Sequence, residues 1–269
     1  MKTVLITGCS SGIGKETAIY FAKNDWNVAA SMRNVNSTEF GGFANIKKIV
    51  LDVSDYESIT AAIDFAIKTF GAIDVIVNNA GYAAAGAFEC ASPEQIKKQF
   101  DVNVFGLMNV TRAILPYFRS KNKGTIINIA SIAGHIAFPT FSLYNSTKFA
   151  VEGYSEALQY ELNPFNIMVK IVEPGPIKTD FYGRSMDVLE NSQIKDYDNF
   201  IAPALQKINN SGNGGLLPIS VAKVIFKAAN SKCNKMHYPV GIQAKVLLLF
   251  KKAIPSCLFR WIIKTYMTT

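Results

Sequence analysis

Close to its start the chain reads Thr3-Val4-Leu5-Ile6-Thr7-Gly8-Cys9-Ser10-Ser11-Gly12-Ile13-Gly14, and residues 15–22 then follow a helical pattern. An apolar strand therefore passes through a glycine-rich turn into a helix. Glycine permits positive φ and a close backbone approach, and the N-terminus of a helix favours negative charge. A tight turn without a ligand is the alternative, but strand, spacing and helix together favour a nucleotide site. We expect the pyrophosphate of a nucleotide to contact Gly8, Ser10, Ser11, Gly12, Ile13 and Gly14.

Short apolar runs rich in Val and Ile recur along the chain, at residues 3–7, 27–31, 46–51, 73–78, 125–130 and 167–172. Such runs suit strands that are covered on both faces, and the amphipathic stretches between them suit crossover helices. We predict an α/β fold: a single Rossmann-type, doubly wound parallel sheet of about seven strands with helices on both faces. Ser92-Pro93 predicts a helix start, and Asn163-Pro164 predicts a helix end.

The composition is that of one folded domain, expected to span residues 1–269. Hydrophobic residues make up 49% of the chain and charged residues 18%, which excludes a disordered or collagen-like protein. Four widely spaced cysteines predict neither a disulfide framework nor a zinc knuckle, and we expect no metal site. No run reaches the roughly 18 apolar residues of a membrane span. Because a strand begins at Thr3, without room for a leader before it, we expect a cytoplasmic protein.

The basic residues are concentrated in the C-terminal part of the chain. The net charge is +8, yet no Asp or Glu follows Asp198. Residues 243–269 combine Lys and Arg with large apolar side chains, which has two interpretations. The segment either packs on the protein, closing the substrate pocket or contacting another subunit, or it attaches peripherally to anionic lipid. We favour packing, and without a recognised binding module we expect no nucleic-acid partner.

The segment 180–217 is too long for an ordinary connection, and it ends in the polar run 209–215, Asn-Asn-Ser-Gly-Asn-Gly-Gly. Long irregular segments in compact domains are often functional, so we predict a mobile substrate lid here. Its large side chains are mostly apolar, and they include Phe181, Tyr182, Met186, Leu189 and Phe200. Since ligand pockets are mostly apolar, the lid favours a lipophilic substrate.

Tyr144 and Lys148 are four residues apart in a helical pattern, so both side chains share one face. An ammonium near a phenol favours the phenolate, and we expect the pKa of Tyr144 to fall from about 10 toward working pH. A tyrosine of that kind exchanges a proton with a carbonyl or alcohol oxygen. Ser131 follows an apolar run, which predicts a place at the ligand-binding edge of the sheet, where its hydroxyl could hold the reacting oxygen.

The preference between cofactors is predicted from the end of the second strand, Ala29-Ala30-Ser31-Met32-Arg33. An acidic residue there would accept from the adenosine ribose, whereas a cation would pair with a 2′-phosphate. No Asp or Glu occurs from Trp26 to Thr38, and the Arg33 guanidinium can bind a phosphate with two hydrogen bonds. We therefore favour NADP(H) over NAD(H). An exposed arginine without a ligand is the alternative.

These motifs resemble those of the short-chain dehydrogenase/reductase family in its compact branch. Six of them follow the family's order over residues 3–180: TGxxxGxG at 7–14, Asn78-Asn79-Ala80-Gly81, Asn103-Val104-Phe105-Gly106, Ser131, Tyr144 and Lys148 in YxxxK, and Pro174-Gly175-Pro176-Ile177-Lys178-Thr179. The basic residue that a subgroup carries within the glycine loop is absent here, since Ser11 holds that position.

The resemblance implies a role for each matching residue. Tyr144 would be the catalytic acid and base, Lys148 would lower its pKa and bind the nicotinamide ribose, Ser131 would position the carbonyl, and Asn103 would complete a proton relay through water. Further cofactor contacts would come from Asp52, Val53, Asn79, Ala80, Gly81, Pro174, Gly175, Ile177 and Thr179. For Asp52 and Thr179 a simple helix cap is the alternative. Related enzymes are often dimers or tetramers, so a homo-oligomer is expected.

The sequence thus predicts an NADP(H)-dependent oxidoreductase that transfers a hydride between nicotinamide and a carbonyl or secondary alcohol of a lipophilic small molecule. A non-catalytic NADP(H) sensor or scaffold on the same fold is the first alternative, because fold alone does not establish activity. An isomerase or dehydratase is the second, and it would show no net change in nicotinamide absorbance.

Overall fold

Seven parallel strands form the central sheet of the computed structural model, which describes residues 1–183 and 185–268. Position 184 of the expected lid and position 269 of the expected tail lie outside the described residues. The strand order is β3-β2-β1-β4-β6-β7-β9, which confirms the predicted doubly wound sheet. The strands are β1 (Thr3–Ile6), β2 (Asn27–Met32), β3 (Ile46–Val50), β4 (Val75–Asn78), β6 (Gly124–Ile129), β7 (Ile167–Pro174) and β9 (His237–Val240).

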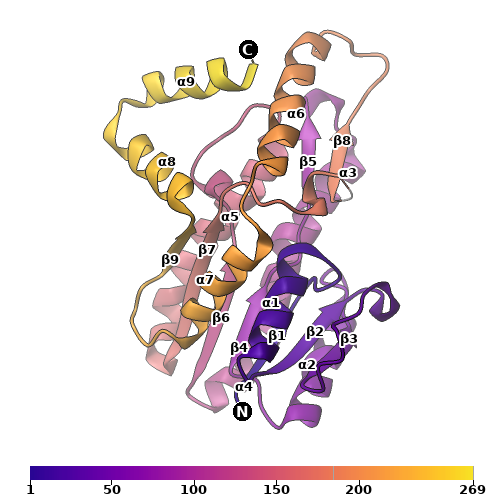
Figure 1. Ribbon diagram of the computed structural model, residues 1–269, viewed down its shortest axis with the longest axis vertical. Helices are drawn as coiled ribbons and strands as arrows, with labels where there is room; N and C mark the ends of the chain where they lie inside the picture. Colours follow the sequence, from indigo (N-terminus) through magenta and orange to yellow (C-terminus); the bar gives the residue numbers. More distant parts are fainter. Residues whose placement is uncertain (184, 269) are drawn as a thin grey trace.

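Helices cover both faces of this sheet (Figure 1). On one face lie α1 (Gly12–Lys23) and α7 (Pro218–Asn230), which pack together through Phe21 and Phe226. The other face is covered by α2 (Tyr56–Phe70), α4 (Leu107–Ser120) and α5 (Ser142–Leu162). The chain crosses from one face to the other between β1 and β4, and this reversal creates the crevice in which doubly wound folds bind ligands.

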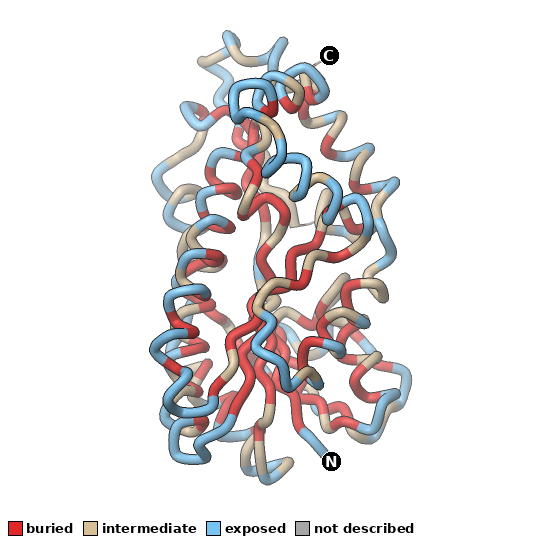
Figure 2. Tube along the Cα trace, turned by 90° about the vertical axis from the view of Figure 1, so that its left-hand side faces the viewer, coloured by how far each residue is buried: buried red, intermediate tan, exposed pale blue. Residues whose placement is uncertain are grey.

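The core consists of two apolar layers, one on each face of the sheet. Ile6, Val28 and Val77 belong to the layer under α1 and α7, and Leu5 and Ile76 belong to the layer under α2, α4 and α5. Consecutive residues of one strand alternate between the layers, so every position of β1 is buried. Figure 2 shows the result, with buried strands at the centre and exposed outer faces on the helices.

Local signals set the predicted helix ends. Ser92 forms a capping box with Gln95, and Pro93 occupies the first turn of α3 (Pro93–Phe100). Helix α5 ends at Leu162, immediately before Asn163-Pro164, as the missing N–H of proline requires. Both boundaries agree with the prediction.

The segment expected as a mobile lid contains regular structure. Its β8 (Met186–Leu189) pairs in parallel with β5 (Ala83–Gly86), and α6 (Asp198–Asn213) follows. The polar run over residues 209–215 is helical in its first five positions, because α6 continues to Asn213. Tertiary packing stabilises the last turn of α6. Gly212 lies so close to the Tyr182 ring that a Cβ on Gly212 would overlap the ring.

The basic tail forms two helices, α8 (Ile242–Ala253), which follows β9, and α9 (Ser256–Thr268), which packs against α6 (Figure 1). Helix α9 buries Phe259, Ile263 and Met267 in one cluster with Tyr144 and Ile208, so part of the tail packs on the protein. Large apolar side chains remain exposed on the outer sides of both helices, at Ile242, Val246, Leu249, Phe250, Leu258 and Trp261. Within the described residues, the structure contains no helix whose length and apolar character suffice to cross a membrane.

Candidate active site

A cavity of about 1210 Å³ opens at the carboxyl ends of the central strands. Apart from Asn103, every residue that the sequence predicted for the site lines it. These residues are Gly8, Ser10, Ser11, Gly12, Ile13, Gly14, Arg33, Asp52, Val53, Asn79, Ala80, Gly81, Ser131, Tyr144, Lys148, Pro174, Gly175, Ile177 and Thr179. The parallel sheet brings them together because its strand ends share one edge.

The glycine loop forms the floor of one end of the cavity. Gly8 and Gly12 have φ of +72° and +56°, a region that side chains other than glycine seldom adopt. A Cβ on Gly8 would lie 2.9 Å from Ala80 Cα, and one on Gly14 would overlap the carbonyl oxygen of Gly8. The backbone therefore lies bare toward the cavity at the N-terminus of α1, which fits a pyrophosphate group.

Thr7 and Asn79 hold this loop against β4. The Thr7 hydroxyl accepts hydrogen bonds from the backbone N–H of Asn79 and Ala80, both at 3.0 Å. The Asn79 amide donates in return to the carbonyl oxygens of Thr7 and Gly8, at 2.8 and 3.1 Å. Asn79 was expected to contact the cofactor, and the structure adds this bracing contact. Thr7, the first residue of the glycine motif, braces the loop and is not among the residues that line the cavity.

Ser131 lies two residues after the end of β6, beside the end of β7. Its hydroxyl donates to the carbonyl oxygen of Pro174 at 3.3 Å and accepts from the backbone N–H of Ala133 at 3.1 Å. Asn145 shapes the turn that follows, since its amide donates to the carbonyl oxygens of Ala133 and Ile136. The serine is therefore held at the sheet edge by both neighbouring segments, as its position after the apolar run predicted.

Tyr144 is 8% exposed and points from the first turn of α5 into an aromatic environment. The ring centroids of Phe141 and Phe181 lie 5.3 and 5.8 Å from its own. This burial raises the pKa of Tyr144 above its ordinary value, assisted by Tyr182 and opposed by a hydrogen bond with Ser131. The expectation of a lowered pKa is wrong for this structure, because desolvation outweighs the groups that favour the phenolate.

Lys148 lies one helical turn after Tyr144, and the spacing puts the two side chains together as predicted. Its ammonium is 5.7 Å from the centroid of the tyrosine ring and donates to the carbonyl oxygen of Ile129 at 2.8 Å. Burial lowers the pKa of Lys148 to about 8, although the Glu152 carboxylate raises it in part. The lysine is thus a buried cation held between α5 and β6.

Asn103 lies behind the cavity in a π-helical turn, η3 (Asp101–Gly106), of the kind often found at functional sites. Its amide donates to the carbonyl oxygen of Tyr82 at 2.8 Å and to the Thr147 hydroxyl at 3.1 Å, and its oxygen accepts from Tyr82 N–H at 3.0 Å. These contacts join the segment after β4 to α5. They show how Asn103 supports the helix that carries Tyr144 and Lys148.

Arg33 follows the last residue of β2 and is exposed at the rim of the cavity. Across residues 1–183 and 185–268 no carboxylate lies within ion-pair distance of its guanidinium. The neighbouring Ser31 hydroxyl donates to the carbonyl oxygen of Ile6 and so faces the sheet. The guanidinium is therefore a charged group held at the rim of the cavity by the end of β2.

Asp52 and Thr179 were expected to contact the cofactor, with a helix cap as the alternative for each, and the structure gives them different surroundings. Asp52 accepts from Ser54 N–H at 2.9 Å, whereas α2 is capped by Asp55, so Asp52 does not cap that helix. Thr179 does cap a helical turn, because its hydroxyl accepts from Phe181 N–H at 3.2 Å. Its methyl carbon nevertheless lies 3.4 Å from the position of a Cβ on Gly12, beside the glycine loop.

The opposite end of the cavity is lined by aromatic and aliphatic side chains. They come from the turn before α5, from the segment after β7 and from the tail helices, and they include Phe138, Phe141, Phe181, Tyr182, Met186, Ile208, Leu247 and Met267. The sequence analysis named Phe181, Tyr182 and Met186 among the lid's apolar residues. The contribution of Leu247 and Met267 arises from the fold, which brings the tail to this end of the cavity.

The model of the short chain dehydrogenase family matches residues 2–190, and the chain belongs to this family. Oxidoreductase YusZ of Bacillus subtilis is 34% identical over 273 residues, which cover 98% of this chain and 97% of that protein. The 3-ketodihydrosphingosine reductase of Bacteroides thetaiotaomicron is 34% identical over 265 residues, with coverage of 98% and 97%.

Solved structures agree with the fold over nearly the whole chain. A short-chain dehydrogenase from Streptomyces avermitilis has a TM-score of 0.85 at 30% identity and covers 100% of this chain and 98% of its own. ElxO with NADP bound has a TM-score of 0.73 at 30% identity, covering 89% and 96%. A 3-ketoacyl-(acyl-carrier-protein) reductase from Brucella melitensis, complexed with NADH, has a TM-score of 0.73 at 26% identity, also covering 89% and 96%. The protein is thus an oxidoreductase of CH–OH groups in small molecules, in a family whose members bind NADP or NADH.

Proposed function

We propose that this protein is an NADP(H)-dependent oxidoreductase that interconverts a lipophilic carbonyl compound and its secondary alcohol. The observation that carries the proposal is the meeting of Ser131, Tyr144 and Lys148 between a bare glycine loop and an apolar pocket. When bound, the nicotinamide supplies or accepts the hydride. The protein binds and orients both reactants and moves the proton.

Tyr144 gives a proton to the carbonyl oxygen when that oxygen is reduced, and takes one back when the alcohol is oxidised. Because burial raises its pKa, the phenol stays protonated near neutral pH, which suits the reductive direction. The Ser131 hydroxyl, which favours the Tyr144 phenolate, donates to the carbonyl oxygen of Pro174 in the structure and can turn from it to donate to the same substrate oxygen. Two donors held at one point stabilise the negative charge that develops on that oxygen.

Lys148 supplies the positive charge of the site. With a pKa of about 8 it is mainly protonated at neutral pH, and it favours the phenolate that remains after Tyr144 has given its proton. The glycine loop would hold the pyrophosphate, with Asp52, Val53, Asn79, Ala80 and Gly81 toward the adenosine and Pro174, Gly175, Ile177 and Thr179 toward the carboxamide. Asn103 acts as a positioning residue for α5.

Arg33 supports the preference for NADP(H). A guanidinium at the end of β2 can bind a 2′-phosphate through charge-assisted hydrogen bonds, each worth about 1.5 to 3 kcal/mol. We expect Arg33→Ala to weaken NADPH binding about 10- to 100-fold and to leave NADH binding nearly unchanged. Fluorescence titration of both cofactors measures this, with the exposed Arg119→Ala as a matched control. Equal losses for both cofactors would contradict a 2′-phosphate contact.

The apolar end of the cavity supports a lipophilic substrate. It is lined by Phe138, Phe181, Met186, Leu247 and Met267, and it adjoins Tyr144. The relative named 3-ketodihydrosphingosine reductase acts, by its name, on the keto group of a lipid, which supports the same substrate class here.

Turnover with a graded set of carbonyl compounds tests the proposed function. Each buried methylene is worth about 0.8 kcal/mol, so four additional methylenes contribute about 3 kcal/mol. We expect kcat/KM with NADPH to rise about 100-fold from short to long-chain ketones and to be lowest for small sugars. NADPH consumption by purified protein measures this. Faster turnover of the sugars would contradict a lipophilic substrate.

A further inference from the structure

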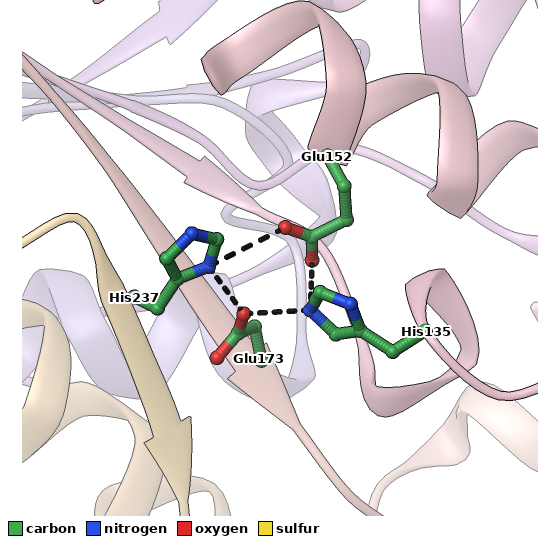
Figure 3. Close-up of side chains that lie close together, drawn as sticks. All are labelled: His135, Glu152, Glu173 and His237. Atoms are coloured by element: carbon green, nitrogen blue, oxygen red, sulfur yellow. Dashed lines mark hydrogen bonds and ion pairs between the residues drawn. The ribbon is translucent and has the colours of Figure 1, made fainter. Parts of the chain in front are cut away.

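Four ionisable side chains meet on the flank of the sheet, outside the residues that line the cavity (Figure 3). They are His135 in the turn after Ser131, Glu152 on α5, Glu173 on β7 and His237 on β9. One nitrogen or oxygen atom from each lies within 4.8 Å of the others. Both histidines of the chain are in this cluster.

The nitrogen and carboxylate atoms of the cluster converge on one point. Glu173 Oε1 lies 2.9 Å from His135 Nε2 and 2.8 Å from His237 Nδ1. The Glu152 carboxylate closes the other side, with Oε1 3.4 Å from His135 Nε2 and Oε2 3.7 Å from His237 Nδ1. The dashed lines of Figure 3 trace this ring of contacts.

The Glu152 carboxylate is aimed into the cluster without a hydrogen bond. Its side chain is only 6% exposed, and neither of its oxygens has a hydrogen-bond partner within the described part of the chain. Gly134 makes the approach possible, because a Cβ there would lie 2.8 Å from Glu152 Cγ. Buried polar atoms normally have a hydrogen-bond partner, and a buried carboxylate without one is suited to bind a water or an ion.

Two carboxylates this deeply buried need a counter-charge. The side chains of Glu152 and Glu173 are 6% and 2% exposed. Lys148 precedes Glu152 by one helical turn, but its ammonium donates to the carbonyl oxygen of Ile129. A dication between two neutral imidazoles and two carboxylates would leave the site without net charge.

We propose that His135, Glu152, Glu173 and His237 form a binding site for one divalent metal ion of the zinc type. Two imidazole nitrogens and two carboxylates are ligands that zinc accepts in four-coordinate sites. Zn–N and Zn–O distances of about 2.0 to 2.2 Å place tetrahedral ligand atoms about 3.4 Å apart. The four contacts described above lie between 2.8 and 3.7 Å, on both sides of that value. The wider pairs, up to 4.8 Å, would close by side-chain rotation.

The surroundings of the cluster provide an entry path and outer contacts. The His135 and His237 side chains are 29% and 40% exposed, so an ion can reach the buried glutamates from their side. Glu156 Oε1 lies 3.4 Å from His237 Nε2, the ring nitrogen that would not bind the metal. Such a carboxylate orients a metal-binding histidine. Lys251 on α8 donates to the backbone carbonyl of His135.

A metal at this point would brace elements that also carry the proposed catalytic residues. His135 follows Ser131 by four positions, Glu152 follows Lys148 by one helical turn, and Glu173 precedes Pro174. The site would also hold the edge strand β9 in place. No apolar run in the sequence predicts this strand. The sequence analysis expected no metal from the wide spacing of the cysteines, and it did not consider these four ligands, which are scattered from position 135 to position 237.

Calorimetric titration of metal-free, full-length and tag-free protein with ZnCl₂ tests the proposal. We expect one Zn²⁺ per chain and, at about 100 times the Kd, a melting temperature raised by about 5 to 10 °C. Mg²⁺ should give no shift, because it prefers oxygen ligands. Co²⁺ in place of Zn²⁺ should show the visible absorption of tetrahedral coordination. A wild-type protein that binds no Zn²⁺ overturns the proposal.

Matched variants locate the ion. Glu152→Gln keeps the shape of the side chain and should melt at the same or a higher temperature without metal, because it removes a buried charge. It should weaken Zn²⁺ binding more than about 100-fold. His237 is half-exposed, and the variant His237→Gln should weaken Zn²⁺ binding by a similar factor. The double variant Cys233→Ser, Cys257→Ser removes the two exposed thiols and should bind Zn²⁺ as the wild type does. Zn²⁺ binding that survives Glu152→Gln and His237→Gln, or that disappears with the thiols, overturns the assignment.

Discussion

Tyr144→Phe is expected to reduce kcat about 10²- to 10⁴-fold with the best carbonyl substrate, while the Kd for NADPH stays nearly unchanged. The substitution removes only the Tyr144 hydroxyl that would exchange the proton with the substrate. The phenyl ring remains packed against Phe141 and Phe181, so the pocket keeps its shape. Stopped-flow measurement of NADPH oxidation separates this loss from slow product release.

The control for this experiment is Tyr160→Phe, which changes the same residue type on the same helix. Tyr160 is 79% exposed, and its replacement should alter neither kcat nor NADPH binding. A Tyr144→Phe enzyme that keeps turnover within about tenfold of wild type would refute the proton-transfer role. Wild-type protein that binds NADPH tightly but turns over no carbonyl compound would favour a sensor or scaffold function instead.

Gly14→Ala is the second substitution with a large expected effect. The added Cβ would overlap the Gly8 carbonyl oxygen and lie 2.6 Å from Asn79 Nδ2, so the glycine loop must move away from α1. Such overpacking costs about 1 to 3 kcal/mol of unfolding free energy. Displaced loop amides would lose hydrogen bonds to the pyrophosphate, and NADPH binding should weaken about 10- to 100-fold. Denaturant unfolding and cofactor titration measure the two effects.

Gly153→Ala is the matched control, because Gly153 also lies in a helix and a Cβ there meets nothing within 4 Å. Alanine is the better helix former, so this variant should be about 0.5 to 1 kcal/mol more stable than wild type. The same chemical change is thus expected to have opposite signs at two helical positions. A destabilised Gly153→Ala, or a Gly14→Ala that binds NADPH normally, would contradict the steric interpretation.

Features that depend on short stretches of chain were predicted well from sequence. The strand, glycine turn and helix at residues 3–23 lie next to one another, and the Tyr144-Lys148 spacing needs only the helical period. Ser92 and Pro164 mark helix ends through contacts within a few residues. The family's motif order then predicted that these local units share one sheet edge, and the cavity brings them together.

Features that depend on distant partners were missed or predicted wrongly. Strand β9 contains Pro239 and is too short for a clear pattern, and it forms because the edge beside β7 can accept it. Helix α6 continues through an Asn- and Gly-rich run because Gly212 packs against Tyr182. In both cases long-range packing outweighed local propensity.

The sequence by itself determined the doubly wound fold, the nucleotide loop and the positions of Ser131, Tyr144 and Lys148. Periodicity, glycine conformation and i,i+4 spacing act over a few residues and are visible in the chain. Only the tertiary structure decided the electrostatics. Phe181 helps to bury Tyr144. The pKa of Tyr144 therefore rises, although the neighbouring Lys148 predicted a fall. Tertiary structure alone also gathers His135, Glu152, Glu173 and His237, because desolvation and charge pairing depend on distances in space that no stretch of sequence specifies.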